Sequence, residues 1–286
     1  MIEAAIPEPT ARRHWWTSPS FLIGAALTLT VVATALLSYV WTPHHPTQMA
    51  ILNRLKPPSS ANWFGTDQFG RDVFSMIMVG ARNSLAVGLG AVGFGMVLGT
   101  TLGLLAAMRR DGLLDNAIMR SADFTHAFPA VLTAIMITAA AGPGMLNAVI
   151  AIGVLNLPYF ARLARGSALQ VWTKDFIQAA RGHGLSNWQI TLRHVLPNIA
   201  GIITVQATIQ FALAVLAEAG LSYLGLGTQP PNPSWGRMLN EAQTFMAVQP
   251  WLAVFPGAAI AITVLGFNLL GDGLRDALDP RVRRAR

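Results

Sequence analysis

The chain contains no cysteine, which excludes disulfide bonds, thiol chemistry and cysteine-held metal ions. Charged residues are also scarce: they make up 12% of the 286 residues, whereas soluble domains carry about 25%. Lysine occurs only as Lys56 and Lys174, and neither stands in the Gly-x-x-x-x-Gly-Lys-Ser/Thr pattern that holds the phosphates of ATP. The composition therefore argues against both an ordinary soluble domain and a P-loop ATPase.

Apolar residues, by contrast, make up 53% of the chain. A helix needs about 20 mostly apolar residues to cross a bilayer. Six stretches meet this requirement: 21–41, 85–108, 124–141, 145–163, 199–221 and 251–270. We expect all six to be helices, because lipid offers the backbone no hydrogen-bond partner. The predicted fold class is all-α, a polytopic membrane protein with six transmembrane helices.

The basic residues predict how this protein is oriented in the membrane. With the N-terminus placed in the cytoplasm, 15 of the 20 lysines and arginines fall on the inner side and 5 on the outer side. We therefore expect both termini in the cytoplasm. The net charge of +7 is spread over several loops rather than gathered in one groove, so it does not indicate nucleic-acid binding.

A polar block at 175–198 interrupts the apolar stretches on the predicted cytoplasmic side. Its pattern predicts two short helices joined by a glycine hinge. Asp175 is expected to cap the first helix, and Gly182 and Gly184 are expected to end it.

The second helix of this block is expected to start at a capping box formed by Ser186 and Gln189. Pro197 is expected to end or redirect it, because proline lacks the amide donor. Apolar side chains are mixed among the charges of the block: Phe176, Ile177, Leu185, Trp188 and Ile190. This mixture favours a folded loop that presses against a partner, and the alternative is an amphipathic loop lying on the membrane surface.

The block resembles the EAA loop of ABC-transporter permeases. Gln178-Ala179-Ala180, Gly184 and Leu196-Pro197 hold the places of that pattern, with glutamine replacing the usual glutamate. The resemblance implies a coupling helix that sits in a cleft of a cytoplasmic ATPase. The residues it assigns to ATPase coupling are Gln178, Ala179, Ala180, Arg181, Gly184, Leu185, Trp188, Leu196 and Pro197.

Three further strings are similar to the C-type permeases of the peptide, opine and nickel importer family. They are GTDQFGRDV at 65–73, LSYLGLG with PPNPSWGRM at 221–238, and FNLLGDGLRDALDPR at 267–281. The resemblance spans residues 65–281 and implies a MetI-like ABC importer transmembrane domain. It divides the chain into an N-terminal tail, first helix and periplasmic segment (1–83), a core permease domain (84–275) and a basic cytoplasmic tail (276–286).

The resemblance also implies a bacterial inner-membrane location and a set of partners. These are a homologous B-type permease, two ABC ATPase subunits that bind ATP and Mg²⁺, and a periplasmic or lipid-anchored substrate-binding protein. No cofactor or metal is expected in this chain, and no catalysis. Peptides are the first expectation for the cargo, and a nickel chelate, glutathione or an opine is the alternative.

Glu218 lies within the fifth apolar stretch, where an acidic residue needs an explanation. It could line the translocation path and face a cationic group of the cargo. It could also hydrogen-bond a neighbouring helix and hold the outer gate, and this second interpretation is slightly favoured.

The second apolar stretch carries Gly95, Gly99 and Gly103 at four-residue steps, which predicts one smooth helix face for close packing. Ahead of it, Asp67, Arg71 and Asp72 could bridge one another, and the simpler expectation is a solvated turn with weak surface ion pairs.

The adjacent histidines His44 and His45 are expected to be loop residues rather than metal ligands, because neighbouring side chains in an extended segment point apart.

Two other functional classes receive less support. A secondary transporter would favour paired acidic residues near mid-membrane, whereas the acidic residues here lie towards helix ends. A membrane-embedded enzyme would need a cluster of catalytic groups at membrane depth. The histidines His183 and His194 fall instead in the polar block.

Overall fold

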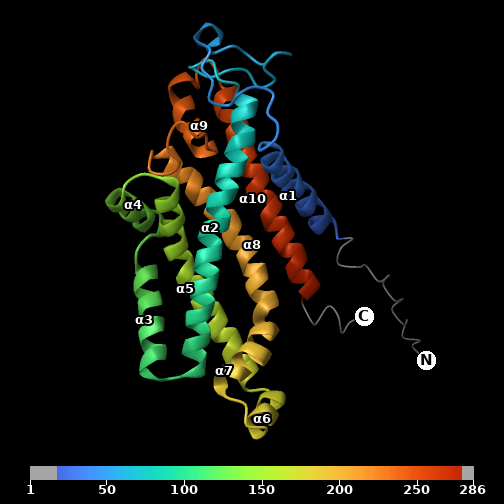
Figure 1. Ribbon diagram of the computed structural model, residues 1–286, viewed down its shortest axis with the longest axis vertical. Helices are drawn as coiled ribbons and strands as arrows, with labels where there is room; N and C mark the ends of the chain where they lie inside the picture. The colour runs from blue at the N-terminus through green and yellow to red at the C-terminus, as the bar shows by residue number, and fades with distance from the viewer. Residues whose placement is uncertain (1–17, 279–286) are drawn as a thin grey trace, which may run out of the picture.

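The computed structural model describes residues 18–278, and within them the regular structure is helical apart from one isolated bridge between Thr66 and Asp72. Long helices run along the long axis of the molecule (Figure 1). Five helices in this part of the chain are long and apolar enough to cross a membrane. They are α1 (Pro19–Leu37), α2 (Val73–Met108), α5 (Met145–Trp172), α8 (Leu196–Tyr223) and α10 (Trp251–Leu278). The all-helical, multi-pass prediction is confirmed.

The third predicted span is not one straight helix. Residues 124–141 fall on two helices, α3 (Leu113–Ala127) and α4 (Ala130–Ala141), which meet at an angle of 93°. The break falls at Phe128 and Pro129. Proline lacks the amide donor, and its ring disfavours the helical conformation of the residue before it. The bent pair is apolar enough to count as a sixth, broken span.

The centre of the bundle is the contact between α2 and α5, and the predicted glycine stripe forms it. A Cβ atom on Gly95 would lie 2.5 Å from Cβ of Asn156, and one on Gly99 would lie 2.5 Å from the carbonyl oxygen of Leu157. Gly103 has an equally close approach to Ala161. Only glycine allows these two backbones to come so close, which confirms the prediction of tight helix packing.

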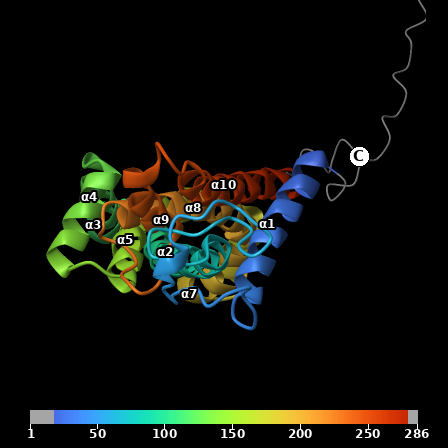
Figure 2. The same ribbon diagram turned by 90° about the horizontal axis from the view of Figure 1, so that it is seen from above.

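The remaining helices surround this pair (Figure 2). Helix α1 lies at one edge of the bundle against α10, while α3 and α4 lie at the opposite edge. Few side chains of α1 are buried, and its outward face carries exposed apolar residues such as Leu22 and Leu29. A helix with such an outward face is suited to contact with lipid or another membrane helix.

The two ends of the bundle carry different structures (Figure 1). One end holds the segment 38–72, which includes the short helix η2 (Ile51–Asn53), together with α9 (Trp235–Ala242) and η4 (Gln243–Phe245). The opposite end holds α6 (Asp175–Gly182) and α7 (Asn187–Ile190). Helix α9 is fixed to α2 by the buried Trp235, whose Nε1 donates a 3.1 Å hydrogen bond to the carbonyl of Ile77.

Candidate functional site

The polar block at 175–198 folds as two helices with a glycine turn, as predicted. Helix α6 ends at Gly182, and Gly184 makes the turn at a φ of +81°, a conformation that favours glycine. The expected cap is wrong in one detail. Lys174 holds the capping position, and Asp175 is the first helical residue. There the negative charge of Asp175 lies at the positive end of the helix dipole.

The capping box at the start of α7 is confirmed. The backbone amide of Gln189 donates to Oγ of Ser186 at 3.3 Å, and the amide of Ser186 donates to Oε1 of Gln189 at 2.9 Å. Two amides at the helix start, which have no partner within a helix, are thereby satisfied.

Of the two outcomes expected at Pro197, an end of the second helix or a change in its direction, the first is wrong. Helix α7 continues through a π-helical turn, η3 (Thr191–Val195), directly into α8. The amide of Leu196 donates to the carbonyl of Thr191, the wider spacing of a π turn. Pro197 then falls in the first turn of α8, where a missing amide is tolerated. The block is therefore continuous with a membrane-spanning helix.

One face of the block is buried in its own chain and the other is exposed. Ile177 and Ile190 are fully buried, Ala180 is buried, and Leu185 is half-buried. Most of the residues assigned to coupling lie on the exposed side: Gln178, Ala179, Arg181, Gly184, Trp188 and Pro197. Trp188 is 49% exposed and is accompanied there by exposed Phe176 and Leu192. Large exposed apolar side chains on a folded surface are suited to contact with another protein.

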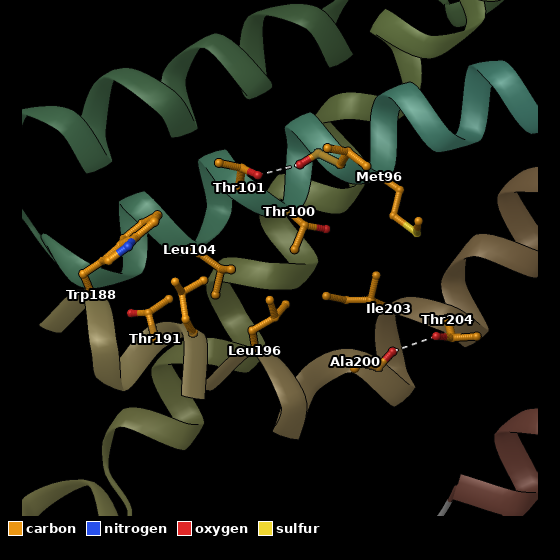
Figure 3. A pocket seen from close by; sticks show the side chains of 12 residues that line it. Met96, Thr100, Thr101, Leu104, Trp188, Thr191, Leu196, Ala200, Ile203 and Thr204 are labelled. Carbon is orange, nitrogen blue, oxygen red and sulfur yellow. Dashed lines mark hydrogen bonds between the residues drawn. The ribbon is translucent and has the colours of Figure 1, made fainter. Parts of the chain in front are cut away.

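A cavity of about 360 Å³, which we call the lower cavity, lies between this block, α2 and α8 (Figure 3). Trp188 and Thr191 line it from the block, and Leu196 lines it from the start of α8. Helix α2 contributes Thr100, whose hydroxyl is buried without a hydrogen-bond partner, and Leu104. The lower cavity thus borders both the block and the first turns of α8.

A second cavity, of about 330 Å³, lies between α4, α5 and α8, and we call it the upper cavity. Its lining is mostly apolar, with three polar side chains: Asn156, Tyr159 and Gln210. We did not predict these residues from the sequence. The signal available was that each is a polar residue inside an otherwise apolar span.

Glu218 lines neither cavity. It is fully buried between α2 and α8, where the Ser84 hydroxyl donates to Oε2 at 2.8 Å and the Ser222 hydroxyl donates to Oε1 at 2.6 Å. The Ser222 oxygen in turn accepts from the amide of Thr228 at 3.1 Å, in the loop that follows α8. This geometry matches the hydrogen-bonding alternative for Glu218.

The expectation of weak surface ion pairs in the outer segment is wrong. Arg71 and Asp67 are 8% and 5% exposed, and their side chains meet at 2.6 Å. Arg71 also reaches Glu241 of α9 at 2.6 Å, and Arg237 binds the other oxygen of Glu241 at 2.8 Å. These four residues form one partly buried network, which we call the outer ion-pair network. It joins the segment before α2 to α9.

Asp72 does not take part in this network. It caps α2 by accepting from the amide of Ser75 at 2.8 Å, and Nδ1 of His44 lies 3.7 Å from its other oxygen. Within residues 18–278, no group of three or more His, Asp or Glu side chains is placed to hold a metal ion.

A further ion pair, also missed in the sequence, fixes α3 to α5 near the block. Arg165 binds both carboxylate oxygens of Asp115, at 2.5 and 2.7 Å. Asp115 is buried, and Arg165 is half-buried. Such bidentate pairs are geometrically specific as well as strong, so this contact holds the broken helix pair at a defined place.

The sequence matches a family model described as "Binding-protein-dependent transport system inner membrane component" over residues 99–284. It is 49% identical, over 79% of this chain and 75% of the relative, to a glutathione transport system permease protein of Pectobacterium atrosepticum. It is 44% identical, over 92% of this chain and 86% of the relative, to a dipeptide transport system permease protein of Alkalihalophilus pseudofirmus.

The fold is similar to that of a chain in inward-facing structures of the MetNI methionine ABC transporter. The TM-score is 0.58 and the sequence identity is 20%, over 74% of this chain and 96% of that chain. At this level of identity the likeness concerns the fold alone. It agrees with the MetI-like architecture expected from the sequence.

Proposed function

Because the chain belongs to the family of binding-protein-dependent transport system inner membrane components, we propose that it is the C-type permease subunit of an ATP-driven importer of small peptides. It forms half of a translocation pathway, and a homologous B-type permease forms the other half. Two ABC ATPase subunits bind and hydrolyse ATP with Mg²⁺, and a periplasmic or lipid-anchored binding protein delivers the cargo. The permease itself carries out no catalysis.

The observation that carries this proposal is the exposed face of the block at 175–198. It combines small residues, Ala179 and Gly184, with the exposed apolar side chains of Phe176 and Trp188. Small residues permit close approach of a partner, and the apolar side chains supply contact area that is otherwise in water. Such a face is suited to bind in a cleft of an ATPase subunit.

The unbroken path from α7 through η3 into α8 supplies a means of transmission. When ATP draws the two ATPase subunits together, the block moves with its ATPase, and α8 moves as a continuation of the block. Rigid-body displacement of α8 changes access to the pathway from the two sides of the membrane. The driving force is the difference in contacts between the ATPase states.

Small peptides are the cargo that the relatives favour. Of the two relatives described above, one is named for dipeptides and the other for glutathione, which is itself a modified tripeptide. Dipeptide is the first candidate because that relative matches along 92% of this chain. Glutathione is the second candidate because the identity to its permeases reaches 49–50%.

The test is ATP-dependent uptake of a radiolabelled dipeptide, and of glutathione, by the full complex in proteoliposomes. Ala179→Trp places a bulky ring on the exposed face of the block and is expected to reduce uptake about tenfold or more, because it blocks the ATPase contact. Leu113→Trp is the matched control, since Leu113 is highly exposed at the start of α3 and lies outside the block. Uptake at the wild-type rate in the Ala179→Trp complex would refute the coupling role.

Ala180→Arg is a less informative variant for the same question. Ala180 is buried against its own chain, so an arginine there disrupts the block before any partner binds. Exposed positions such as Ala179 separate loss of the ATPase contact from loss of the fold.

A further inference from the structure

Some of the α8 residues that line the two cavities lie on one side of the helix. Leu196, Ala200 and Ile203 line the lower cavity, while Gln210, Ala214, Ala217 and Leu221 line the upper one. Successive members of this set are three, four or seven residues apart, which places them on one side of a helix. We call this set the α8 track. The α8 track begins beside the block at 175–198 and extends to the opposite half of α8, near the loop that follows this helix (Figure 1).

Gln210 is the one polar residue of the α8 track. It is 3% exposed, and among residues 18–278 its side-chain amide makes no hydrogen bond, although it lines the upper cavity. An amide that forms no hydrogen bond in an apolar surrounding raises the free energy of the folded state, because it has lost the hydrogen bonds it makes in water. A side-chain amide in this position inside a cavity is suited to a ligand that forms the missing hydrogen bonds with it.

The chemistry of the cavity selects the kind of ligand. Nδ2 of Asn156 donates to the carbonyl of Ile152 at 3.0 Å, which leaves its Oδ1 as an acceptor, and Tyr159 supplies a hydroxyl. No charged side chain lines the cavity. Amide and hydroxyl groups complement another amide, which also carries one donor and one acceptor. A lipid acyl chain fills the apolar space but leaves Gln210 unsatisfied.

We propose that Gln210, together with Asn156, is a contact in the upper cavity for the uncharged backbone amide of a peptide in transit. This inference rests on the proposed import of small peptides and names residues that contact that cargo. Recognition of the backbone rather than of side chains or termini lets one pathway carry peptides of differing sequence. An apolar lining with few polar contacts also keeps binding weak enough for release, as transport requires.

The first test replaces the amide by an apolar group of similar size. Gln210→Leu is expected to lower the number of dipeptides moved per ATP about five- to tenfold, because the cargo amide is left unpaired in the membrane. Stimulation of ATP hydrolysis by the loaded binding protein is expected to stay at the wild-type level. Gln206→Leu is the control: Gln206 lies one turn earlier on α8 and lines neither cavity.

An unchanged ratio of dipeptide to ATP in the Gln210→Leu complex would overturn the inference. Peptide uptake by the wild-type complex is measured alongside, so that failure of this inference can be told apart from failure of the proposed function. A wild-type complex that carries no peptide refutes the function, whereas peptide uptake that is indifferent to Gln210 refutes the contact alone.

A second measurement covers the case in which the Gln210→Leu complex fails to assemble. A dipeptide bearing a small diazirine is cross-linked to the wild-type complex during turnover, and the modified residues are mapped by mass spectrometry. Cross-links on the upper cavity, at Leu213, Leu216 or Asn156, support the inference. Cross-links confined to other surfaces overturn it. A phospholipid retained in the cavity after purification, or a helix of the partner permease filling it, overturns it as well.

Discussion

At the scale of single residues, burial decides what the acidic side chains do. Glu218 lies deep in the bundle, yet both of its oxygens accept hydrogen bonds from serine hydroxyls, and it lines neither cavity. Asp67 lies in a loop, yet it is almost as deeply buried and is paired with Arg71. The sequence left both roles open for Glu218, with the hydrogen-bonding one slightly favoured, and it predicted a solvated Asp67.

Replacing Glu218 by glutamine is expected to weaken the bundle. One of the two serines would then have to accept a hydrogen bond instead of donating it, and Ser222 already accepts from Thr228. We expect a loss of about 1–3 kcal/mol, the usual effect of disturbing a buried hydrogen-bonded group. The measurement is a lower thermal midpoint of the purified complex, with reduced uptake. Asp272→Asn, at an exposed position, is the control. A Glu218→Gln complex of wild-type stability but without transport would point back to a pathway role.

The outer ion-pair network yields a second residue-scale prediction. Arg71→Met leaves two partly buried carboxylates, Asp67 and Glu241, without their shared cation. Breaking a buried pair in this way costs about 3–5 kcal/mol. The variant is expected to show faster proteolysis of the 38–72 segment and a lower thermal midpoint. Arg54→Met, in the same segment but exposed and outside the network, should leave both unchanged. Equal behaviour of the two variants would mean that the network contributes nothing to the fold.

At the scale of the elements, two prolines act in opposite ways. Pro129 separates α3 from α4 and bends the apolar stretch by 93°. Pro197 lies in the first turn of α8, directly after the π turn, and the helical path continues through it. From the sequence we expected only Pro197 to interrupt a helix, and we expected residues 124–141 to form one helix. Which of them broke a helix depended on the local hydrogen bonds around it, and these are not encoded by the proline alone.

The packing of α2 against α5 supplies the element-scale prediction. Gly99→Ala places a methyl group 2.5 Å from the Leu157 carbonyl, so the two helices must separate. Overpacking of this kind costs about 1–3 kcal/mol. We expect a lower yield of assembled complex in the membrane, measured by co-purification with the partner subunits. Gly93→Ala is the control, since no atom lies within 4 Å of the added Cβ and alanine favours helix. A normal yield for Gly99→Ala would argue against the close contact.

At the scale of the whole molecule, the two ends of the bundle differ in what they carry. The 38–72 segment, α9 and the outer ion-pair network lie at one end, and the block at 175–198 lies at the other (Figure 1). Most of the lysines and arginines belong to the loops and tails predicted to lie on the same side as the block, and this excess favours a cytoplasmic location for the block. This orientation is the one in which the block can reach ATPase subunits.

The orientation can be tested through the absence of cysteine, because an introduced cysteine is the only thiol in the chain. In intact spheroplasts, a membrane-impermeant maleimide is expected to label Leu52→Cys, whose side chain is 96% exposed in the outer segment. His183 is exposed in the block at 175–198, and His183→Cys is expected to stay unlabelled until the membrane is permeabilised. The reverse labelling pattern would place the block outside and end the importer interpretation.

The sequence by itself determined that this protein is helical, crosses the membrane several times and belongs to its family. Apolar runs, glycine steps and capping patterns are local, and local patterns fix which residues form a helix and which face packs closely. The tertiary structure decided which polar groups are satisfied. Glu218 meets Ser84 across 134 positions, and Arg71 meets Glu241 across 170, whereas the Gln210 amide meets no partner among residues 18–278. Pairing between distant residues depends on how the helices assemble, and no periodicity along the chain records it.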